Sequence, residues 1–391
     1  MYISSLTLTN FRNHPDLRFS LTPSPIILTG LNGSGKTNIL EAVSLLVPGR
    51  GLCRATASEW QNKANPDPWA VVAEVALPSG VCKIATGRNP ELPESERRLV
   101  QIDGQMAKNQ QVLADYVGMA WITPDMDRVM AEGPSARRKL MDRMAYSFDP
   151  AHAGRVHRYE KALRERLRLL RDGVADAAWL AGLEDEMART GVAIAAARQQ
   201  MLRHLQTSIA ETQSVFPKAI LSLAGMVEES LAKEEPALLI EDKLRSALAR
   251  NRGDDAQSGT CAVGPHRSDL KVIHGGHHCP ADLCSTGEQK ALLVAVMLAF
   301  VRTLARVRGM QPLFLLDDIT AHLDRTRREA LFEEILSLGV QAWLTGTDSE
   351  PFETLLPKAQ SFAATPRRGA SAFFLEQIVI RMASLDDNLN A

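Results

Sequence analysis

The chain has 391 residues, of which 45% are hydrophobic and 23% are charged. These values exclude a disordered, collagenous or coiled-coil-dominated chain, and the length suggests two or three domains. With a formal net charge of -1, any nucleic-acid binding must depend on local basic patches.

The first predicted elements are strands followed by one helix. Leu6 and Leu8 alternate with polar residues, and the apolar run 25–29 ends at Gly30. Apolar residues then recur at helical spacing over 39–46, which predicts the order strand, glycine loop, helix. Further strands are expected at 69–77 and 81–85, and Asp103-Gly104 indicates a hairpin.

Beyond about residue 110 the pattern becomes helical. Asp149 is expected to cap a helix that has Pro150 at its first position. This helix is amphipathic, and its polar face carries a row of basic residues: Arg158, Lys161, Arg164, Arg168 and Arg171. A further helical stretch covers 177–205, and 251–259 is predicted to be a loop.

Strands and helices alternate again after that loop. A helix is expected from about Glu288, a strand at 313–316, a helix at 327–337 and a strand at 341–345. This alternation is typical of a parallel α/β sheet. We therefore divide the chain into an N-terminal α/β segment (1–115), an inserted, mostly helical domain (116–255) and a C-terminal α/β segment (256–391).

The cysteine content and hydropathy favour a cytoplasmic protein. Five cysteines, an odd number, are expected to be free thiols in a reducing compartment. The segment 1–10 lacks the features of a signal peptide. The longest apolar run, 291–301, is shorter than the roughly 20 residues that cross a bilayer, so we expect a buried helix and no membrane partner.

The strongest motif lies between the second predicted strand and the first helix. It fits G-x-x-x-x-G-K-S/T, the phosphate-binding P-loop, and consists of Gly30, Leu31, Asn32, Gly33, Ser34, Gly35, Lys36 and Thr37. Backbone N–H groups of such a loop face the phosphates of ATP. Lys36 is expected to contact the β- and γ-phosphates and Thr37 a Mg²⁺ ion. A plain glycine turn is the alternative, which this context disfavours.

Two carboxylates follow the apolar strand 313–316. We expect Asp317 to bind Mg²⁺ through water and Asp318 to orient or deprotonate the attacking water. A helix cap or a solvated turn is the alternative. Lys36, Asp317 and Asp318 are thus the predicted catalytic residues.

A third segment, Ser285-Thr286-Gly287-Glu288-Gln289, precedes the long apolar helix. It offers a hydroxyl and N–H groups at a helix start, but by itself the segment is better explained as an ordinary helix cap. Ser285, Gly287 and Gln289 are candidate nucleotide contacts only in combination with the P-loop.

The motifs together resemble a known architecture. The P-loop, the segment 285–289, the aspartate pair and Ala321-His322-Leu323-Asp324 occur in the order of an ABC-type ATPase head, in which the signature segment of one subunit closes over ATP held by the other. Segments 10–14 (NFRNH), 38–42 (NILEA), 133–138 (GPSARR) and 264–270 (GPHRSDL) further resemble the RecF family of bacterial DNA replication and repair proteins.

The resemblance implies a mixed-sheet ATPase head with a helical insertion and no long coiled-coil arm. It implies an ATP-dependent homodimer, with Mg²⁺, that binds duplex DNA at single-strand gaps and helps RecO and RecR to load RecA in recombinational repair, replication restart and the SOS response. A weak, DNA-stimulated ATPase is expected, because the short Asp318 side chain stands where many ABC ATPases have Glu.

Some features depart from the ABC pattern. Thr345-Gly346-Thr347-Asp348 replaces the usual switch histidine, and Gln105, Gln110 and Gln111 are open candidates for the Q-loop glutamine. Candidate DNA contacts are Arg137, Arg138, Lys139 and the basic helix face, although Glu160 and Glu165 also allow that face to be merely solvated.

Other classes of protein fit less well. A transporter ATPase subunit is weakened by the large insertion, and an SMC-like head by the missing heptad arm. The segment 62–65 (NKAN) lacks the aspartate of a GTPase motif. A binding module with a vestigial ATP site remains an alternative. The loop with His274, His277, His278, Cys279 and Cys284 has no paired-ligand spacing, so no zinc site is predicted there.

Overall fold

The structure, a computed structural model, describes residues 1–89, 91, 97–173, 176–321, 323–366 and 373–378. The chain forms two compact units. Residues 1–126 with 304–391 make up what we call the head unit, and 127–303 make up the helical unit. These limits differ from the predicted 115 and 255. The strand Met119–Ile122 pairs with Leu313–Leu316 in the head unit. The strands Asp269–His274 and Cys279–Pro280 and most of the helix Thr286–Arg308 belong to the helical unit.

The first sheet of the head unit is antiparallel. Its strand order is β2-β1-β4-β5-β6-β7. The strands are β1 (Tyr2–Phe11), β2 (His14–Ser20), β4 (Ala70–Leu77), β5 (Gly80–Arg88), β6 (Arg98–Ile102) and β7 (Gln105–Met106). Alternate residues of β1, including Leu6 and Leu8, are fully buried, as the sequence pattern predicts.

The second sheet of the head unit is mostly parallel and carries the P-loop. Its order is β15-β14-β3-β13-β12-β8, and only the β14–β15 pair is antiparallel. The strands are β3 (Ile26–Gly30), β8 (Met119–Ile122), β12 (Leu313–Leu316), β13 (Ala342–Gly346), β14 (Gln360–Pro366) and β15 (Phe373–Ile378). Parallel pairing brings the carboxyl ends of β3, β13 and β12 to one edge of the sheet.

Helices α1 (Lys36–Ser44), α2 (Leu113–Tyr116) and α10 (Arg325–Leu338) also belong to the head unit. Asp324 caps α10 by accepting the N–H of Arg327 (2.9 Å), and Gly339 ends the helix with a positive φ of 60°. The predicted helix at 327–337 is therefore confirmed, two residues longer at its start.

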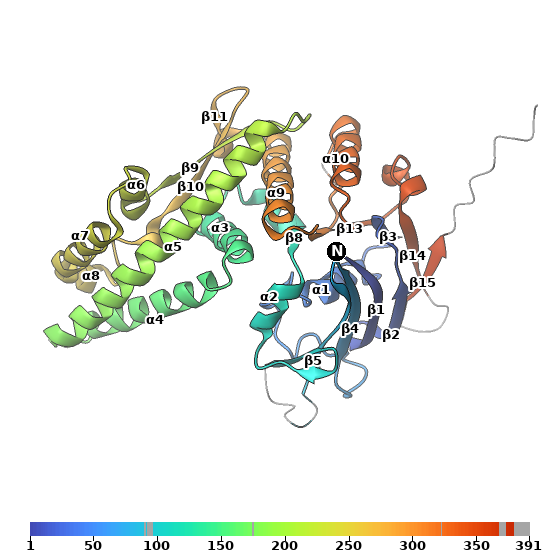
Figure 1. The fold of residues 1–391 in the computed structure, drawn as a ribbon, viewed down its shortest axis with the longest axis horizontal. Coiled ribbons are helices and arrows are strands. Elements are labelled where there is room, and N and C mark those ends of the chain that lie inside the picture. The colour runs from blue at the N-terminus through green and yellow to red at the C-terminus, as the bar shows by residue number, and fades with distance from the viewer. Residues whose placement is uncertain (90, 92–96, 174–175, 322, 367–372, 379–391) are drawn as a thin grey trace, which may run out of the picture. The chain divides into compact units, whose positions relative to one another are not determined.

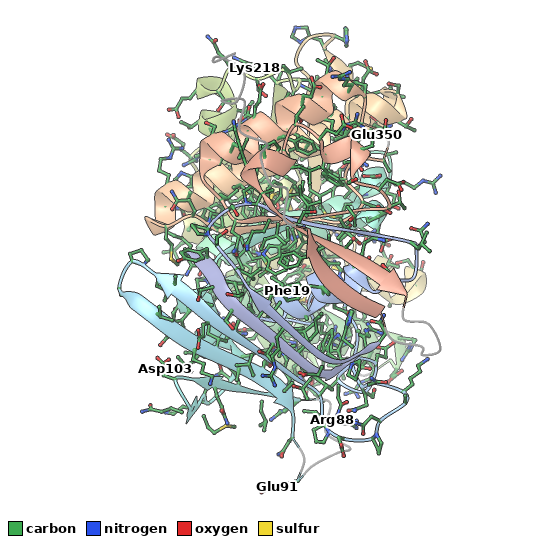
Figure 2. The ribbon with its side chains drawn as sticks, turned by 90° about the vertical axis from the view of Figure 1, so that its right-hand side faces the viewer. Phe19, Arg88, Glu91, Asp103, Lys218 and Glu350 are labelled. Atoms are coloured by element: carbon green, nitrogen blue, oxygen red, sulfur yellow. The ribbon has the colours of Figure 1, made fainter. Side chains whose placement is uncertain are left out.

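The two sheets of the head unit enclose a shared apolar core. Figure 2 shows Phe19 of β2 in the interior of this unit, where its ring meets Trp343 of β13 and Phe362 of β14 edge to face, with centroids 6.1 and 5.1 Å apart. Such aromatic pairs add to the stabilisation from buried apolar area. This core fixes the parallel sheet against the antiparallel one.

The helical unit contains long helices and a small sheet (Figure 1). Its helices are α3 (Pro134–Phe148), α4 (His152–Arg171), α5 (Ala177–Glu211), α6 (Met226–Ala232), α7 (Ala237–Arg250), α8 (Arg252–Ser258) and most of α9 (Thr286–Arg308). The sheet, in the order β11-β10-β9, consists of β9 (Ala219–Ala224), β10 (Asp269–His274) and β11 (Cys279–Pro280). Helices α4 and α5 run side by side and bury Tyr159, Met187 and Val192 in one cluster.

Two sequence predictions in this unit are wrong. The helix α4 begins at His152, because Asp149 caps a turn through the N–H of Ala151 (3.0 Å) and Pro150 stays outside the helix. The expected loop 251–259 contains α8, because Asp255 is buried in an ion pair with Arg166 (2.7 Å). The pair of Arg166 with Asp255 joins residues far apart in the chain and has no local sequence signal.

No helix in the described part of the chain is both long enough and apolar enough to span a membrane.

Candidate functional site

The P-loop curls tightly between β3 and α1. Gly30, Gly33 and Gly35 all have positive φ, of 144°, 82° and 95°, a region that other residues rarely adopt. A Cβ atom on Gly35 would lie 2.5 Å from Nδ2 of Asn13 and 2.7 Å from Nε2 of His14. The loop conformation therefore needs glycine both for its backbone angles and for space.

The segment after β1 holds this loop from the side. Asn13 accepts a hydrogen bond from Nδ2 of Asn38 on α1 (2.7 Å), and Nε2 of His14 lies 3.2 Å from the carbonyl oxygen of Gly35. Arg12 pairs with Glu41 of α1 through two contacts of 2.8 and 2.9 Å. The family-like segment 10–14 thus positions the P-loop and its helix.

The side chain of Lys36 folds back over the loop. Its Nζ donates to the carbonyl oxygens of Gly30 (2.6 Å) and Leu31 (3.0 Å). Burial lowers the pKa of Lys36, and the nearby carboxylates, led by Asp318 and Asp317, partly offset that effect. An ammonium group is thus held against the glycine loop at the start of α1, where it can attract phosphate.

Asp317 is a buried carboxylate surrounded by hydroxyl groups. Thr37 Oγ1 lies 3.1 Å from both of its oxygens, and Thr345 Oγ1 donates to Oδ1 at 2.8 Å. Burial raises the pKa of Asp317, while the hydrogen bonds from Thr345 and Thr37 act in the opposite direction. A carboxylate and a hydroxyl side by side form a hard-oxygen donor set of the kind that suits Mg²⁺.

Asp318 and the segment after β13 complete this edge of the sheet. Asp318 has a positive φ of 51°, and its N–H donates to Thr345 Oγ1 (2.8 Å). The carbonyl oxygen of Thr347 accepts from the N–H of Gly30 (3.2 Å), and Asp348 is one of the carboxylates that act on Lys36. Sequence reasoning gave neither Thr345 nor Asp348 a role, although both follow a strand that pairs with β3.

The open Q-loop candidates lie elsewhere in the head unit. Gln110 accepts from Arg98 Nε (3.3 Å) and from the N–H of Gly49 (3.2 Å), and Gln105 lies in β7. Gln111 lies in the short turn Gln110–Val112, and its N–H donates to the side chain of Asn109 (2.9 Å). His322 of the predicted Ala321–Asp324 motif lies outside the described residues.

The segment 285–289 is part of the helical unit, at the start of α9. Ser285 and Glu288 form a capping box, in which Glu288 Oε2 accepts from Ser285 Oγ (2.7 Å) and from its N–H (2.9 Å). Ser285 is exposed and Gly287 lies in the first turn of α9. Gln289 is buried and donates to the carbonyl oxygen of Cys284 (2.8 Å).

The predicted basic residues divide into interior and surface groups. Arg137 is buried and forms a two-point pair with Asp269 (2.7 and 2.9 Å), and Arg138 is half-buried and donates to the carbonyl oxygen of Ser268 (2.7 Å). Lys139 is exposed. The whole predicted row on α4 is exposed as well: Arg158, Lys161, Arg164, Arg168 and Arg171.

Known proteins are similar to this chain in sequence. The family described as "RecF/RecN/SMC N terminal domain" matches residues 2–355. A protein of Mesorhizobium japonicum, "DNA replication and repair protein RecF", is 44% identical over 362 residues, which cover 92% of this chain and 95% of that protein. A protein of Rhizobium rhizogenes with the same description is 44% identical over 93% of this chain and 96% of its own length.

Solved structures show the same fold. "Structure of the recombination mediator protein RecF-ATPrS in RecFOR pathway" has a TM-score of 0.82 and 22% identity, and covers 97% of this chain and 98% of that one. An SMC head domain derived from Pyrococcus furiosus has a TM-score of 0.54 at 16% identity, over 96% of each chain. The fold is therefore that of an ABC/SMC-type ATPase head.

Within that class, the relatives with similar sequences identify the family. The chain belongs to the RecF family of DNA replication and repair proteins.

Proposed function

We propose that this chain is an ATP-dependent switch that binds DNA in recombinational repair, with ATP and Mg²⁺ held at the edge of the parallel sheet. The observation that carries the proposal is the convergence of Lys36, Thr37 and Asp317, in which Thr37 Oγ1 and the Asp317 carboxylate lie 3.1 Å apart. Two motifs far apart in the sequence thus supply one group of side chains for phosphate and Mg²⁺.

Each residue has a defined part in the proposed reaction. The loop 30–35 presents backbone N–H groups to the phosphates, and Lys36 exchanges its carbonyl partners for phosphate oxygens. Thr37 and Asp317 hold Mg²⁺, which, when bound, neutralises the charge that develops on the transferred phosphoryl group. Asp318, on its strained backbone, orients or deprotonates the attacking water, and its short side chain is consistent with slow turnover.

The nucleotide also controls dimerisation. In the proposed dimer the segment with Ser285, Gly287 and Gln289 of one subunit closes over ATP held by the other. The solved structures with this fold are described as RecF with ATPrS and with ATP in the RecFOR pathway, which supports nucleotide binding by the present chain. ATP hydrolysis then opens the dimer.

Substitution of Lys36 tests the nucleotide site. Lys36→Ala is expected to abolish binding of a fluorescent ATP analogue and ATP-induced dimerisation, measured by sedimentation. Lys83→Ala, at an exposed position of β5, is the matched control. If Lys36→Ala binds and dimerises like the wild type, the site is assigned to the wrong residues.

The DNA partner is a duplex with a single-strand gap, where the dimer acts with RecO and RecR to load RecA. The exposed basic row on α4 supplies phosphate contacts without sequence preference. Arg158 forms an ion pair with Glu186 (3.2 Å), and Arg164 forms one with Glu160 (3.6 Å). Arg171 likewise pairs with Asp172 (3.4 Å), so Lys161 and Arg168 are the best candidates in this row.

Fluorescence anisotropy with a labelled gapped duplex tests this surface. With Mg-ATP, Lys161→Gln combined with Arg168→Gln is expected to weaken binding and to reduce the salt slope of log K by about 2. Arg203→Gln combined with Arg250→Gln removes the same charge from exposed positions of α5 and α7 and is the control. Equal losses in both double variants would mean that general charge, and not α4, binds the DNA.

A further inference from the structure

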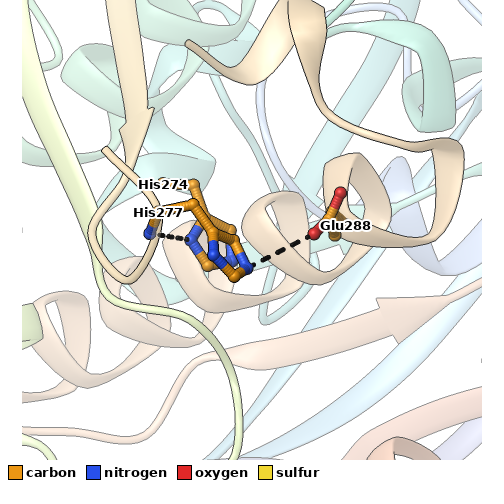
Figure 3. Close-up of side chains that lie close together, drawn as sticks. All are labelled: His274, His277 and Glu288. Atoms are coloured by element: carbon orange, nitrogen blue, oxygen red, sulfur yellow. Dashed lines mark hydrogen bonds and ion pairs between the residues drawn. The ribbon is translucent and has the colours of Figure 1, made fainter. Parts of the chain in front are cut away.

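Three side chains of the helical unit, none of them among the proposed nucleotide contacts, converge at the end of the small sheet. His274 ends β10, His277 lies in the turn that follows, and Glu288 lies in the first turn of α9 (Figure 3). One potential ligand atom from each lies within 4.8 Å of the other two. Nε2 of His277 and Oε1 of Glu288 are 3.6 Å apart.

Two hydrogen bonds hold the imidazole of His274 in the turn. Ligation of a metal through either ring nitrogen would replace them, because a neutral imidazole has only one unprotonated nitrogen. Nδ1 of His274 accepts the N–H groups of Gly276 (3.2 Å) and His277 (3.3 Å). The N–H of His278 donates to the carbonyl oxygen of His274 (2.8 Å). The rings of His274 and His277 stack with centroids 4.5 Å apart, and one ligand atom of each ring lies within 4.8 Å of a Glu288 oxygen.

The two carboxylate oxygens of Glu288 make different contacts. Oε2 accepts both hydrogen bonds from Ser285 in the capping box, while Oε1 faces His277. The carboxylate is therefore already oriented by the backbone of α9. Its second oxygen is available without disruption of the helix cap.

We propose that His274, His277 and Glu288 form a binding site for a divalent transition-metal ion of the zinc type. Two imidazoles and one carboxylate, with one coordination position left for water, are a known three-ligand set for Zn²⁺. Ligand atoms about 2.0–2.1 Å from a tetrahedral ion are about 3.3 Å from one another, close to the observed 3.6 Å. The His277 side chain is 65% exposed and is free to close the remaining gap.

The cysteines beside this cluster are not part of the ligand set. Among the described residues, the group of ligand atoms that lie within 4.8 Å of one another contains His274, His277 and Glu288 and neither cysteine. The spacing of His and Cys in the sequence therefore gives no zinc signal. The third ligand, Glu288, comes from another element.

The site has a consequence for the segment 285–289, which rests on the proposed function. A cation on Oε1 holds the Glu288 carboxylate in place, and its Oε2 holds Ser285. Metal binding therefore stabilises the capped form of the segment that is proposed to close over ATP. The existence of the metal site itself does not depend on that role.

Titration of the untagged full-length chain with Zn²⁺ by calorimetry, and with Co²⁺ by visible absorption, tests the site. We expect one ion per chain, with d–d bands of Co²⁺ bound by nitrogen and oxygen. His277→Asn and Glu288→Gln are each expected to weaken binding at least tenfold. Glu288→Gln is suited to the capping box, so this variant keeps the helix start intact.

His278→Asn is the matched control. His278 is in the same turn with a positive φ of 52°, which Asn tolerates, and it is outside the cluster, so binding is expected to be unchanged. No Zn²⁺ binding by the wild type, or unchanged binding by both His277→Asn and Glu288→Gln, would overturn the proposal. ATP binding, measured in the same variants, separates this result from a failure of the nucleotide site.

Discussion

The ion pair between Arg12 and Glu41 gives the sharpest test of how the P-loop is held. Glu41 is fully buried, and its carboxylate accepts from Arg12 (2.8 and 2.9 Å) and from Trp60 Nε1 (2.9 Å). Removal of one partner leaves a buried charge without compensation, which typically costs 3–5 kcal/mol. The Arg12 side chain is 26% exposed, so we expect Arg12→Met to cost about 3 kcal/mol, more than a hundredfold in the unfolding equilibrium.

The double variant separates charge from packing. Arg12→Met combined with Glu41→Gln leaves no buried charge, and the amide oxygen still accepts from Trp60. We therefore expect the second substitution to restore at least half of the lost stability.

Denaturant unfolding followed by tryptophan fluorescence is a suitable assay. Trp60 and Trp69 pack edge to face at 5.2 Å beside this pair, so their emission reports on this part of the head unit. ATP affinity is expected to fall in Arg12→Met as well, since Arg12 positions the residues that contact Gly35. A loss below 1 kcal/mol, or a double variant less stable than the single one, would refute the reasoning.

Three other substitutions test single residues in the head unit and the helical unit. Asp318→Asn is expected to bind ATP but to release phosphate about 100-fold more slowly, and a normal rate in a phosphate-release assay would exclude Asp318 from the reaction. Gly35→Ala is expected to lose ATP binding and at least 1–2 kcal/mol of stability in denaturant unfolding, because alanine resists the positive φ; wild-type behaviour would contradict the described loop. In the helical unit, burial raises the pKa of Asp142, but the hydrogen bond from His152 and the charge of Arg198 (2.8 Å) outweigh it, so the net pKa is lowered. The stability that this lowered pKa contributes is present above the unfolded pKa of about 3.9 and is lost as pH falls through the lower folded value. Arg198→Met should therefore move the midpoint of acid unfolding, measured by circular dichroism, to higher pH. An unchanged midpoint would count against the ion pair.

Local sequence signals predicted the elements that depend on neighbouring residues. The run 313–316 matches β12 residue for residue, and the glycine loop lies between β3 and α1 as expected. Glycine spacing, apolar runs and capping residues act within a few positions of the chain. The family resemblance rests on the same segments.

Contacts between distant residues could not be derived in this way. The burial of Arg137 against Asp269, the ion pair of Arg166 with Asp255 and the formation of α8 all depend on packing across the helical unit. An arginine in a basic stretch looks the same in sequence whether it faces water or a carboxylate. Burial removes that ambiguity, because a charge leaves water only where a partner compensates it.

The sequence by itself determined the glycine loop between β3 and α1, the strand β12 and the aspartate pair that follows it, because each depends on backbone conformation or spacing within one short segment. Only the tertiary structure brought Thr345 to Asp317 and Glu288 to His277. The order of strands in a sheet and the packing of a turn against a helix are not encoded by any single segment. Those arrangements decide which side chains share a site.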